Sequence, residues 1–588
     1  MNSRSHHKPS APDPHGVEMA LAESELYADC CELAGSPRDG DDGSVKLRPT
    51  LDRSQHRALL LLVAANAIAE LCFLGWLVGP GHWRATLSQP RPGGIFGAAA
   101  LLAIVVIELV RLVQVGSLWV FALNARDPVP MRAAGGLRVA LVTTIVPSCE
   151  PVALVARTLA AMRRVDYPGG TVDVWILDEG DDPQVQAVAR RLGVRHFSRR
   201  GKPECNTASG PFRARTKAGN HNAWLAAHGR VYDVVAQLDP DHVPGRHLLE
   251  RTLGYFRDPD VAFVVAPQVY GNAHAGLVRH GAAAQAFLFH GVIQRGCNGL
   301  GAPLLIGTNH VYRTEAMVSI GGYQDSIIED HLTSMTLHAT VNPRTARRWK
   351  GIYTPDVLAV GQAPATWGDF FTQQQRWAYG AAEIALRHSW RLRRKLARPQ
   401  RVAYALLQSF YPGVALTWVL GTGVTIGYLT HASTPPHFEA GSWGLLWTAS
   451  VATTLALLLW LRRLNLAPYE RRELGGTAIL ATLCAGPIYV AAVTSAALGR
   501  PLAYRVTPKG SASRSDRLGT FRRHLVWLAV VMAALMFNVL AGTDRLVPCF
   551  WALVTIGALA MPPAMHVARM LRRQCAPSTS SASTVRVP

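Results

Sequence analysis

The chain has 588 residues, which is more than one hydrophobic core usually holds, so we expect at least two structural units. Hydrophobic residues make up 49% of the sequence and charged residues only 17%, a balance too apolar for an ordinary soluble protein. The formal net charge of +21 suits either a nucleic-acid partner or Lys and Arg gathered at the cytoplasmic ends of membrane helices, so the position of the charge decides between these classes.

The nine cysteines are scattered along the chain, without a CxxC pair or a Cys/His cluster at zinc spacing. This pattern favours neither a zinc module nor a disulfide framework. Residues 1–56 are hydrophilic and precede the first apolar run, so we predict a disordered cytoplasmic tail rather than a cleavable signal peptide. Residues 572–588 are rich in Ser and Thr, which predicts a second disordered tail.

Six apolar runs are long enough to cross the hydrocarbon core of a bilayer, which is about 30 Å thick and takes roughly 20 residues. They lie near residues 57–79, 96–123, 408–430, 442–461, 523–541 and 547–570. A seventh stretch, 477–499, has basic clusters on both sides, so both of its ends are expected in the cytoplasm. We therefore predict six membrane spans and one interfacial helix, broken near Gly486 and Pro487.

Basic residues also set the orientation of the spans. The loop at 430–442 has no Lys or Arg and the loop before the last span has only Arg545, so both are expected outside, although Arg84 and Arg91 in the first outer loop run against the rule. Both chain ends and the central region then lie in the cytoplasm, and the charge needs no nucleic-acid partner. The predicted units are a tail at 1–56, two membrane helices at 57–124, a cytoplasmic domain with interfacial helices at 125–405, two membrane helices at 406–461, an interfacial helix and loop at 462–522, two membrane helices at 523–571 and a tail at 572–588.

The central region alternates apolar, β-branched runs with helical patterns. Strands are expected at 139–146, 172–182 and 234–242, which predicts an α/β domain with a mostly parallel sheet. In such sheets ligands bind beyond the carboxyl ends of the strands. Two of these strands end in acidic residues, Asp178 with Glu179 and Asp239 with Asp241, and acids at that edge favour a metal site.

The triplet from Asp239 to Asp241, followed by His242, offers hard oxygen ligands and one imidazole on a tight turn. That set suits Mg²⁺ or Mn²⁺ shared with a diphosphate. A DxD triplet alone occurs by chance in many chains, so the motifs around it decide its meaning.

Further motifs follow in order: RTKAGNHN at 215–222, IGTN at 306–309, GGYQDSIIEDH at 321–331, QQQRW at 373–377 and YRVTPK at 504–509. With the acidic triplet, this series resembles the processive family 2 glycosyltransferases, specifically the bacterial-type cellulose synthase family. The match runs over roughly 50–575. The resemblance implies a GT-A-type nucleotide-sugar domain in the cytoplasm, joined to an all-α polytopic domain in the plasma or inner membrane. We expect neither a PilZ module nor an N-terminal zinc finger.

The resemblance also assigns roles at the donor end. Asp178 would contact the uridine or ribose, with closure of a strand-end turn as its alternative. Glu179 departs from the usual DDG, which leaves its role open. Lys217 would contact phosphate, while Gly219 and the asparagines after it close a turn.

At the acceptor end, Asp330 is the expected general base, because a positioned carboxylate can take the proton of an attacking sugar hydroxyl. Its alternative is an acid favoured by a helix N-terminus. Glu329 completes the acid pair at the acceptor, and Ile328 stands where the motif has Thr.

The QQQRW motif places Gln373, Arg376 and Trp377 on one helical turn. The Arg376 guanidinium suits a leaving diphosphate and Trp377 offers a ring on which a sugar can rest, whereas both would otherwise be membrane anchors. By resemblance Thr507 and Lys509 belong to a loop that closes over the nucleotide; the alternative is an ordinary basic loop.

The implied reaction inverts the anomeric centre of a UDP-sugar, with UDP-glucose and a cellulose-like β-1,4-glucan as the leading donor and product, and couples synthesis to export. The implied partners are the donor, the growing glycan, the lipid bilayer and accessory secretion or cell-wall subunits. Mixed-linkage glucan, mannan, chitin and hyaluronan remain alternative products, because motifs do not specify the sugar. A non-processive lipid-linked sugar transferase and a non-catalytic transporter or scaffold are the other classes.

Overall fold

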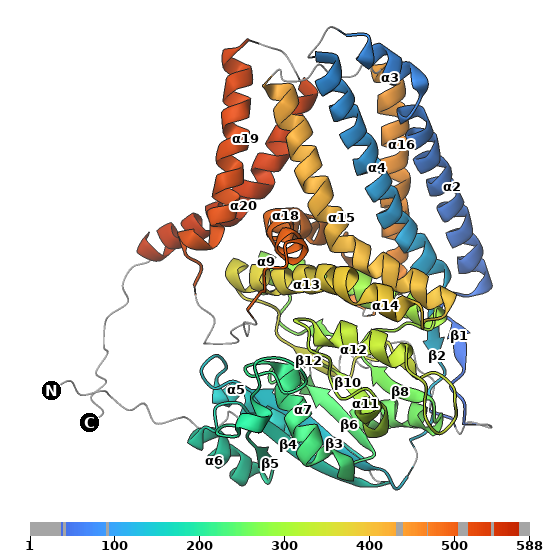
Figure 1. Cartoon of the computed structure of the whole chain (residues 1–588), viewed down its shortest axis with the longest axis vertical. Coiled ribbons are helices and arrows are strands. Elements are labelled where there is room, and N and C mark those ends of the chain that lie inside the picture. Colours follow the sequence, from blue (N-terminus) through green and yellow to red (C-terminus); the bar gives the residue numbers. More distant parts are fainter. Residues whose placement is uncertain are drawn as a thin grey trace, which may run out of the picture.

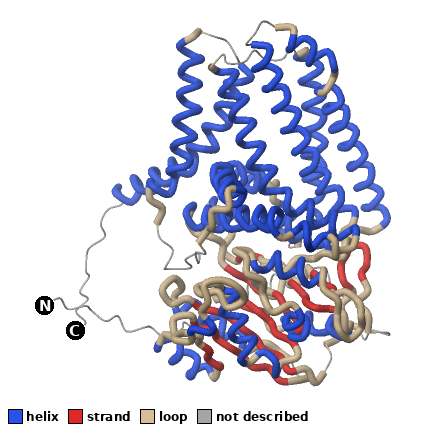
Figure 2. The backbone as a smooth tube through the Cα atoms, in the orientation of Figure 1, coloured by secondary structure: helices blue, strands red, loops and turns tan. Residues whose placement is uncertain are grey.

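The computed structural model has a bundle of long helices above a domain built on a sheet (Figure 1). It describes residues 37–38, 43–89, 93–133, 135–167, 169–430, 439–466, 468–503, 515–542 and 546–575. Figure 2 shows the same division, with strands confined to the lower part and helices alone in the upper part. The two predicted types of structural unit are therefore both present.

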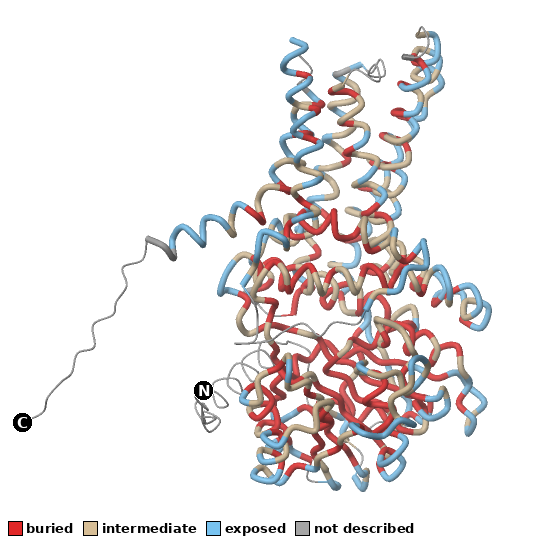
Figure 3. The backbone as a smooth tube through the Cα atoms, turned by 60° about the vertical axis from the view of Figure 1, so that its left-hand side comes forward, coloured by how far each residue is buried: buried red, intermediate tan, exposed pale blue. Residues whose placement is uncertain are grey.

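Seven helices in the described part are long and apolar enough to cross a membrane. They are α2 Arg53–Leu77, α4 Gly93–Leu123, α15 Arg398–Leu429, α16 Ala440–Leu461, α18 Gly476–Ala497, α19 Arg522–Leu540 and α20 Leu546–Cys575. In Figure 3 the upper helices are largely exposed or intermediate, whereas buried backbone gathers in the sheet domain and at the junction. Apolar helices with exposed outer faces are what a lipid surrounding requires.

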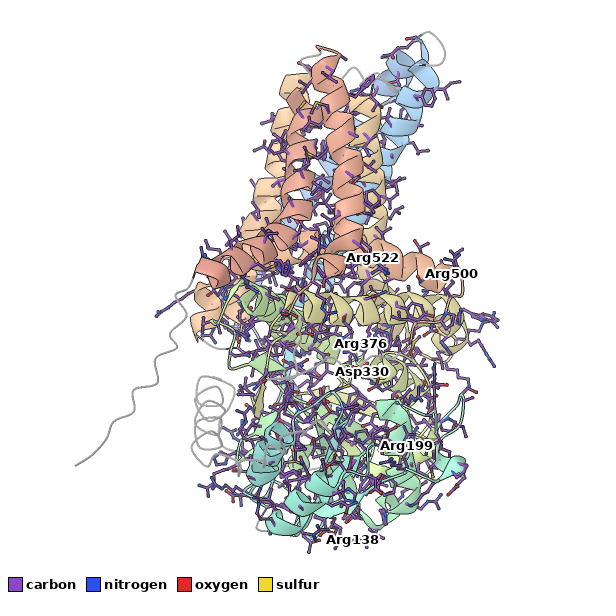
Figure 4. The ribbon with its side chains drawn as sticks, turned by 90° about the vertical axis from the view of Figure 1, so that its left-hand side faces the viewer. Arg138, Arg199, Asp330, Arg376, Arg500 and Arg522 are labelled. Atoms are coloured by element: carbon purple, nitrogen blue, oxygen red, sulfur yellow. The ribbon has the colours of Figure 1, made fainter. Side chains whose placement is uncertain are left out.

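The helix α18 lies across the base of the bundle, between the other long helices and the sheet domain (Figures 1 and 4). This orientation fits the predicted interfacial helix, although its length and hydropathy alone would let it span. The predicted break near Gly486 and Pro487 is wrong, because α18 runs through both residues. A Cβ on Gly486 would lie 2.4 Å from the Trp418 ring, so this glycine lets α18 approach α15 closely instead of ending the helix.

The central domain has a seven-stranded sheet in the order β11-β8-β10-β6-β3-β4-β5. Its strands are β3 Arg138–Ile145, β4 Thr171–Asp178, β5 Arg195–Phe197, β6 Val234–Leu238, β8 Val261–Val265, β10 His310–Arg313 and β11 Lys350–Tyr353. Only β10 runs antiparallel to its neighbours, so the predicted mostly parallel sheet is confirmed. Two small sheets pair β1 Leu47–Pro49 with β2 Arg126–Pro128, and β12 Ala359–Gly361 with β7 Val243–Pro244 and β9 Val269–Tyr270.

Both faces of the large sheet are buried. Along β3, Val139 and Leu141 belong to one apolar core and Ala140 and Val142 to another, because successive side chains of a strand point to opposite faces. The helices of this domain are α5 Val152–Met162, α6 Pro183–Leu192, α7 Lys217–Ala227, α8 Leu248–Thr252, α11 Thr314–Ser319 and α12 Glu329–His338. A sheet covered on both faces explains the nearly continuous apolar runs of its strands.

Several helices occupy the junction between domain and bundle, and α13 runs horizontally there, above α12 (Figure 1). The shorter elements of the upper part and the junction are α3 Pro80–Leu87, α9 Leu277–Leu288, α10 Gln294–Gly299, α13 Trp367–Arg387, α14 Ser389–Arg393 and α17 Pro468–Arg472. They bring the carboxyl edge of the sheet and the bases of the long helices within reach of one another.

A charged cluster joins α2, α4 and α16 inside the bundle. Arg111 donates from both terminal nitrogens to Glu70, at 2.7 and 2.6 Å, and from Nε to Glu108 at 2.6 Å. The Thr454 hydroxyl donates to the same Glu70 at 2.9 Å. Buried charges persist only when they are paired and hydrogen-bonded, so this cluster ties together three helices that are remote in sequence.

We expect Arg111→Met to lower the free energy of unfolding by about 3–5 kcal/mol, because it leaves Glu70 and Glu108 without their cation. Unfolding in mixed detergent–SDS micelles measures the change, with the exposed Arg84→Met as control. The double variant Glu70→Gln/Arg111→Met should lose less than the sum of the single losses; additive losses would contradict the pairing.

Candidate functional site

The candidate site lies at one edge of the large sheet. The strands β3, β4 and β6 are parallel, so their carboxyl ends meet there, and β10, which is antiparallel, begins at the same edge. Asp178 therefore comes to the same edge as Asp239, together with the IGTN turn at 306–309. The topology alone gathers motifs that are far apart in the chain.

One ligand atom from each of Asp239, Asp241 and His242 lies within 4.8 Å of the others. Asp241 and His242 are fully buried, and the backbone N–H of Gln362 donates to Asp241 at 3.2 Å. Nε2 of His242 is buried and has no hydrogen-bond partner among the described residues. Two carboxylates and an imidazole, whose Nδ1 lies 3.4 Å from the Asp241 carboxylate, fit a divalent cation such as Mg²⁺ or Mn²⁺.

Lys217 lies directly beside this triplet. Its ammonium donates to the Asp239 carboxylate and to the backbone carbonyl of Gly307. Lys217 is the first residue of α7, whose N-cap Thr216 accepts from the N–H of Gly219 at 3.1 Å. A lysine and a helix N-terminus at the same point favour an anion such as phosphate.

Asp178 is fully buried, and its carboxylate closes the turn after β4. It accepts from the N–H groups of Gly180 at 2.9 Å and Asp182 at 2.6 Å and lies 3.2 Å from His196 Nε2. These contacts are those expected of a residue that closes a strand-end turn. Contact of Asp178 with the uridine or ribose stays a prediction. A second possible metal group consists of Asp178, Asp181 and His196. The Asp178 carboxylate of this group is already hydrogen-bonded to two backbone N–H groups.

The acid pair begins α12. Asp330 accepts from the N–H of His331 at 2.8 Å. Burial raises the pKa of the Glu329 carboxyl, and the neighbouring Asp330 charge raises it further. Burial also raises the pKa of Asp330, opposed by the His331 N–H and by the positive charges of Lys217 and Arg376. The two carboxyls therefore titrate as a pair that holds a proton more readily than isolated acids.

The predicted QQQRW residues lie on α13, and Figure 4 shows Arg376 directly above Asp330. Gln374, which the sequence did not single out, is buried; it accepts from the Tyr489 hydroxyl at 2.5 Å and donates to Gln285 at 3.2 Å. This amide ties α13 to α18 and α9, so it holds the helix that carries Arg376.

A single cavity of about 2440 Å³ connects these groups. The predicted residues that line it are Glu179, Lys217, Asp239, Asp241, Glu329, Asp330, Gln373, Arg376 and Trp377. It continues upward between long helices, where it is lined by Gln114 of α4, Phe410 of α15 and Thr454 of α16. Asp178 and His242 are not among its lining residues, and Thr507 and Lys509 lie outside the described residues.

The family described as glycosyl transferase family group 2 matches residues 234–494, from β6 to α18. This part of the chain is a family 2 glycosyltransferase domain. The resemblance to family 2 glycosyltransferases that the motifs indicated is thereby confirmed, and the matched range contains the acidic triplet, the acid pair and QQQRW.

Cellulose synthase catalytic subunits are similar to this chain over a longer stretch. The subunit of Xanthomonas axonopodis pv. citri is 29% identical over 371 residues, which are 60% of this chain and 46% of the relative. That of Pseudomonas fluorescens is 27% identical over 364 residues, with 60% and 46% covered. The chain thus spans about half the length of the curated relatives it matches.

Solved structures resemble the domain more remotely. A mannosyltransferase from Pyrobaculum calidifontis, solved in complex with GDP-Man and Mn²⁺, is 15% identical, with a TM-score of 0.39 over 73% of this chain and 99% of that chain.

Two contributors to the glycosyltransferase site escaped the sequence reasoning. Glu150, in the PSCEP segment after β3, lines the cavity and accepts from the N–H of Val146 at 2.8 Å. The sequence could have indicated Glu150, because it follows β3, a third strand that ends at the same edge of the sheet. Arg199, which pairs with Glu179, had no such signal, because it stands in a run of basic residues that looks like an ordinary surface.

We expect Asp241→Asn to weaken Mn²⁺ binding by the purified protein at least tenfold, because a neutral amide replaces a charged ligand. Electron paramagnetic resonance of free Mn²⁺ measures the affinity. Asp181→Asn in the second acidic group is the matched control and should bind as the unaltered protein does. If Asp181→Asn weakened Mn²⁺ binding and Asp241→Asn did not, the cation would belong to the group around Asp178.

Proposed function

We propose that this chain is a membrane-embedded, inverting glycosyltransferase that extends a β-linked polysaccharide from a UDP-sugar, with UDP-glucose as donor and a cellulose-like β-1,4-glucan as product. The observation that carries the proposal is the cavity that joins Asp239, Lys217, Asp330 and Arg376 and continues between the apolar helices. Similarity to cellulose synthase catalytic subunits supports the same donor and product.

At the donor end, Asp239, Asp241 and His242 would hold Mg²⁺ or Mn²⁺. When bound, such an ion would supply positive charge that offsets the charge of the diphosphate. Lys217 and Arg376 supply fixed positive charge on the same cavity, and fixed charge away from water stabilises a leaving diphosphate without reorganisation.

At the acceptor end, Asp330 takes the proton of the sugar hydroxyl as its oxygen attacks the anomeric carbon, while the bond from that carbon to UDP breaks and its electron pair leaves with UDP. The His331 N–H and the charges of Lys217 and Arg376 favour the ionised form of Asp330. Attack opposite to the leaving group inverts the anomeric centre.

The upper end of the cavity supports a path for the growing chain. Sugars cannot cross lipid unaided, so a product made below the bundle needs a route lined by polar and aromatic groups. Trp377, Tyr411, Gln114 and Thr454 line successive parts of this route, and an aromatic ring offers a face for a sugar. We propose that synthesis and export are coupled along it, with six spans, an interfacial α18 and accessory secretion or cell-wall subunits on the far side.

Basic residues support a cytoplasmic catalytic domain. Arg462 and Arg463 follow α16, and Arg522 and Arg523 begin α19, so positive charge gathers at the ends of these helices nearest the sheet domain. The segment with Thr507 and Lys509 is the proposed nucleotide-closing loop. Asp516, which follows this segment in the sequence, lines the cavity and accepts from the N–H of Gly368 at 2.8 Å.

The proposal is tested with the full chain in lipid nanodiscs, given radiolabelled UDP-glucose, UDP-N-acetylglucosamine, GDP-mannose and UDP-glucuronate with Mg²⁺ or Mn²⁺. We expect incorporation from UDP-glucose into long product that endo-β-1,4-glucanase digests, loss of incorporation with EDTA, and recovery with either ion. Exclusive use of another donor would replace the glucose assignment. A single sugar added to a lipid would overturn polymerisation.

Asp330→Asn should lower kcat by about 10²–10⁴-fold, because the acceptor hydroxyl loses its base, while UDP binding stays within about twofold. UDP release measured by a coupled assay gives kcat, and calorimetry gives UDP affinity. Glu315→Gln, a change in an exposed ion pair of α11, serves as control. Full UDP release by the Asp330 variant would remove it from the chemistry.

The rate should fall as the pH drops through the pKa of the acid pair, because protonation removes the base. Both carboxyl pKa values are raised, so this fall lies at higher pH than for an isolated aspartate. Removing the negative neighbour in Glu329→Gln should make Asp330 easier to ionise and move the fall to lower pH. The profile of kcat against pH measures both; an unshifted profile would contradict the coupling.

A further inference from the structure

Arg199, just beyond β5, is almost completely buried, with 1% of its surface exposed. Figure 4 places it in the lower domain, below Asp330. Its guanidinium holds the carboxylate of Glu179 in a two-point pair, with Nε at 2.9 Å from Oε2 and Nη2 at 2.7 Å from Oε1. A buried arginine in this geometry is among the strongest side-chain contacts that a protein makes.

The remaining donors of Arg199 go to backbone carbonyls. Nη1 donates to the carbonyls of Cys205 at 3.0 Å and Arg213 at 3.1 Å, with that of Phe212 at 3.4 Å, and Nη2 donates to that of Thr216 at 3.2 Å. The segment from 205 to 216 thus folds around one guanidinium whose five N–H groups all have acceptors. Without Arg199, the segment would lose the one charged donor that these carbonyls share, although those of Phe212, Arg213 and Thr216 each keep a second donor.

The Thr216 carbonyl connects Arg199 to the catalytic cavity, because Thr216 and Lys217 both line it. Thr216 is the N-cap of α7, and the next residue is Lys217, whose ammonium contacts Asp239 and Gly307. The first turn of α7 also packs tightly on the same segment: a Cβ on Gly219 would lie 2.1 Å from the Arg213 carbonyl oxygen and 2.7 Å from Arg199 Nη1. The place of Lys217 therefore depends on the segment that Arg199 gathers.

We propose that Arg199, held by Glu179, is a positioning residue for the nucleotide end of the cavity, where it sets the place of Lys217. This inference rests on the proposed function. It also accounts for Glu179, where the related sequences have aspartate: the additional methylene lets the carboxylate meet both sides of the buried guanidinium. Glu179 then acts through Arg199.

The chemistry of the pair predicts which substitutions matter. Lysine has three donors on a point charge and cannot reproduce the planar fork, so Arg199→Lys is not conservative here. Glu179→Asp keeps the charge but shortens the side chain, and Arg199→Met removes both the cation that pairs with Glu179 and the donor that the four carbonyls share. Arg195→Met is the matched control, since Arg195 begins β5, the strand that Arg199 follows, and is exposed, with Asp173 at 3.2 Å and the Trp175 ring as its contacts.

The experiment uses the full chain in nanodiscs, with UDP and Mn²⁺ as the probe in calorimetry, UDP-glucose turnover, and thermal unfolding of each variant. We expect Arg199→Lys and Glu179→Asp to weaken UDP binding and raise the donor KM about tenfold, as the loss of a hydrogen bond to a charged group does. The control should match the unaltered protein in all three measurements.

The outcomes separate the two claims. If the unaltered chain does not bind UDP, the proposed function fails and this inference fails with it. If it binds UDP, and Arg199→Lys and Glu179→Asp bind UDP as tightly as the unaltered chain, the proposed function stands and the positioning role is overturned. A lower unfolding temperature with unchanged UDP affinity would make Arg199 a purely stabilising residue and would also overturn it. If Arg199→Lys does not fold, Glu179→Asp decides.

Discussion

The contact between Lys217 and Asp239 is the interaction on which the rest of the site depends. It joins the first residue of α7 to the carboxyl end of β6 and reaches the carbonyl of Gly307 before β10. Three segments that are separate in sequence meet at this ammonium, and the acid pair of α12 lies close enough for its charge to act there. The side chains that line the cavity include ten carboxyl groups and seven Lys or Arg side chains, so acidic groups are in modest excess. Such an excess of carboxyl groups favours the binding of a divalent cation, which can in turn bind a diphosphate.

The second constraint is the junction between the sheet domain and the long helices. The helix α13 carries Arg376 into the cavity, and its buried Gln374 is fastened to α18 by the hydroxyl of Tyr489. The close approach of α18 to α15 at Gly486 continues the same packing upward. The junction therefore combines this polar contact with an apolar core shared by α9, α13, α15 and α18, and this packing holds the cavity open to both parts.

Much of the fold could be predicted from local sequence patterns. The strands at 139–146, 172–182 and 234–242 are found as β3, β4 and β6, because both of their faces are buried and each reads as an apolar run. The break predicted in α18 was wrong for a physical reason. A proline costs a helix one N–H, and a glycine costs backbone entropy, but close packing against Trp418 offsets both.

What the sequence determined by itself was the set of motifs, the alternation of strands and helices and the apolar runs, because these follow from the chemistry of neighbouring residues. The tertiary structure alone decided which side chains meet. The turn-closing contacts of Asp178, the pair between Glu179 and Arg199, and the cluster around Arg111 each join groups that no local pattern links. Their partners are chosen by how the chain folds back, since burial makes an unpaired charge costly only once the surrounding elements have closed around it.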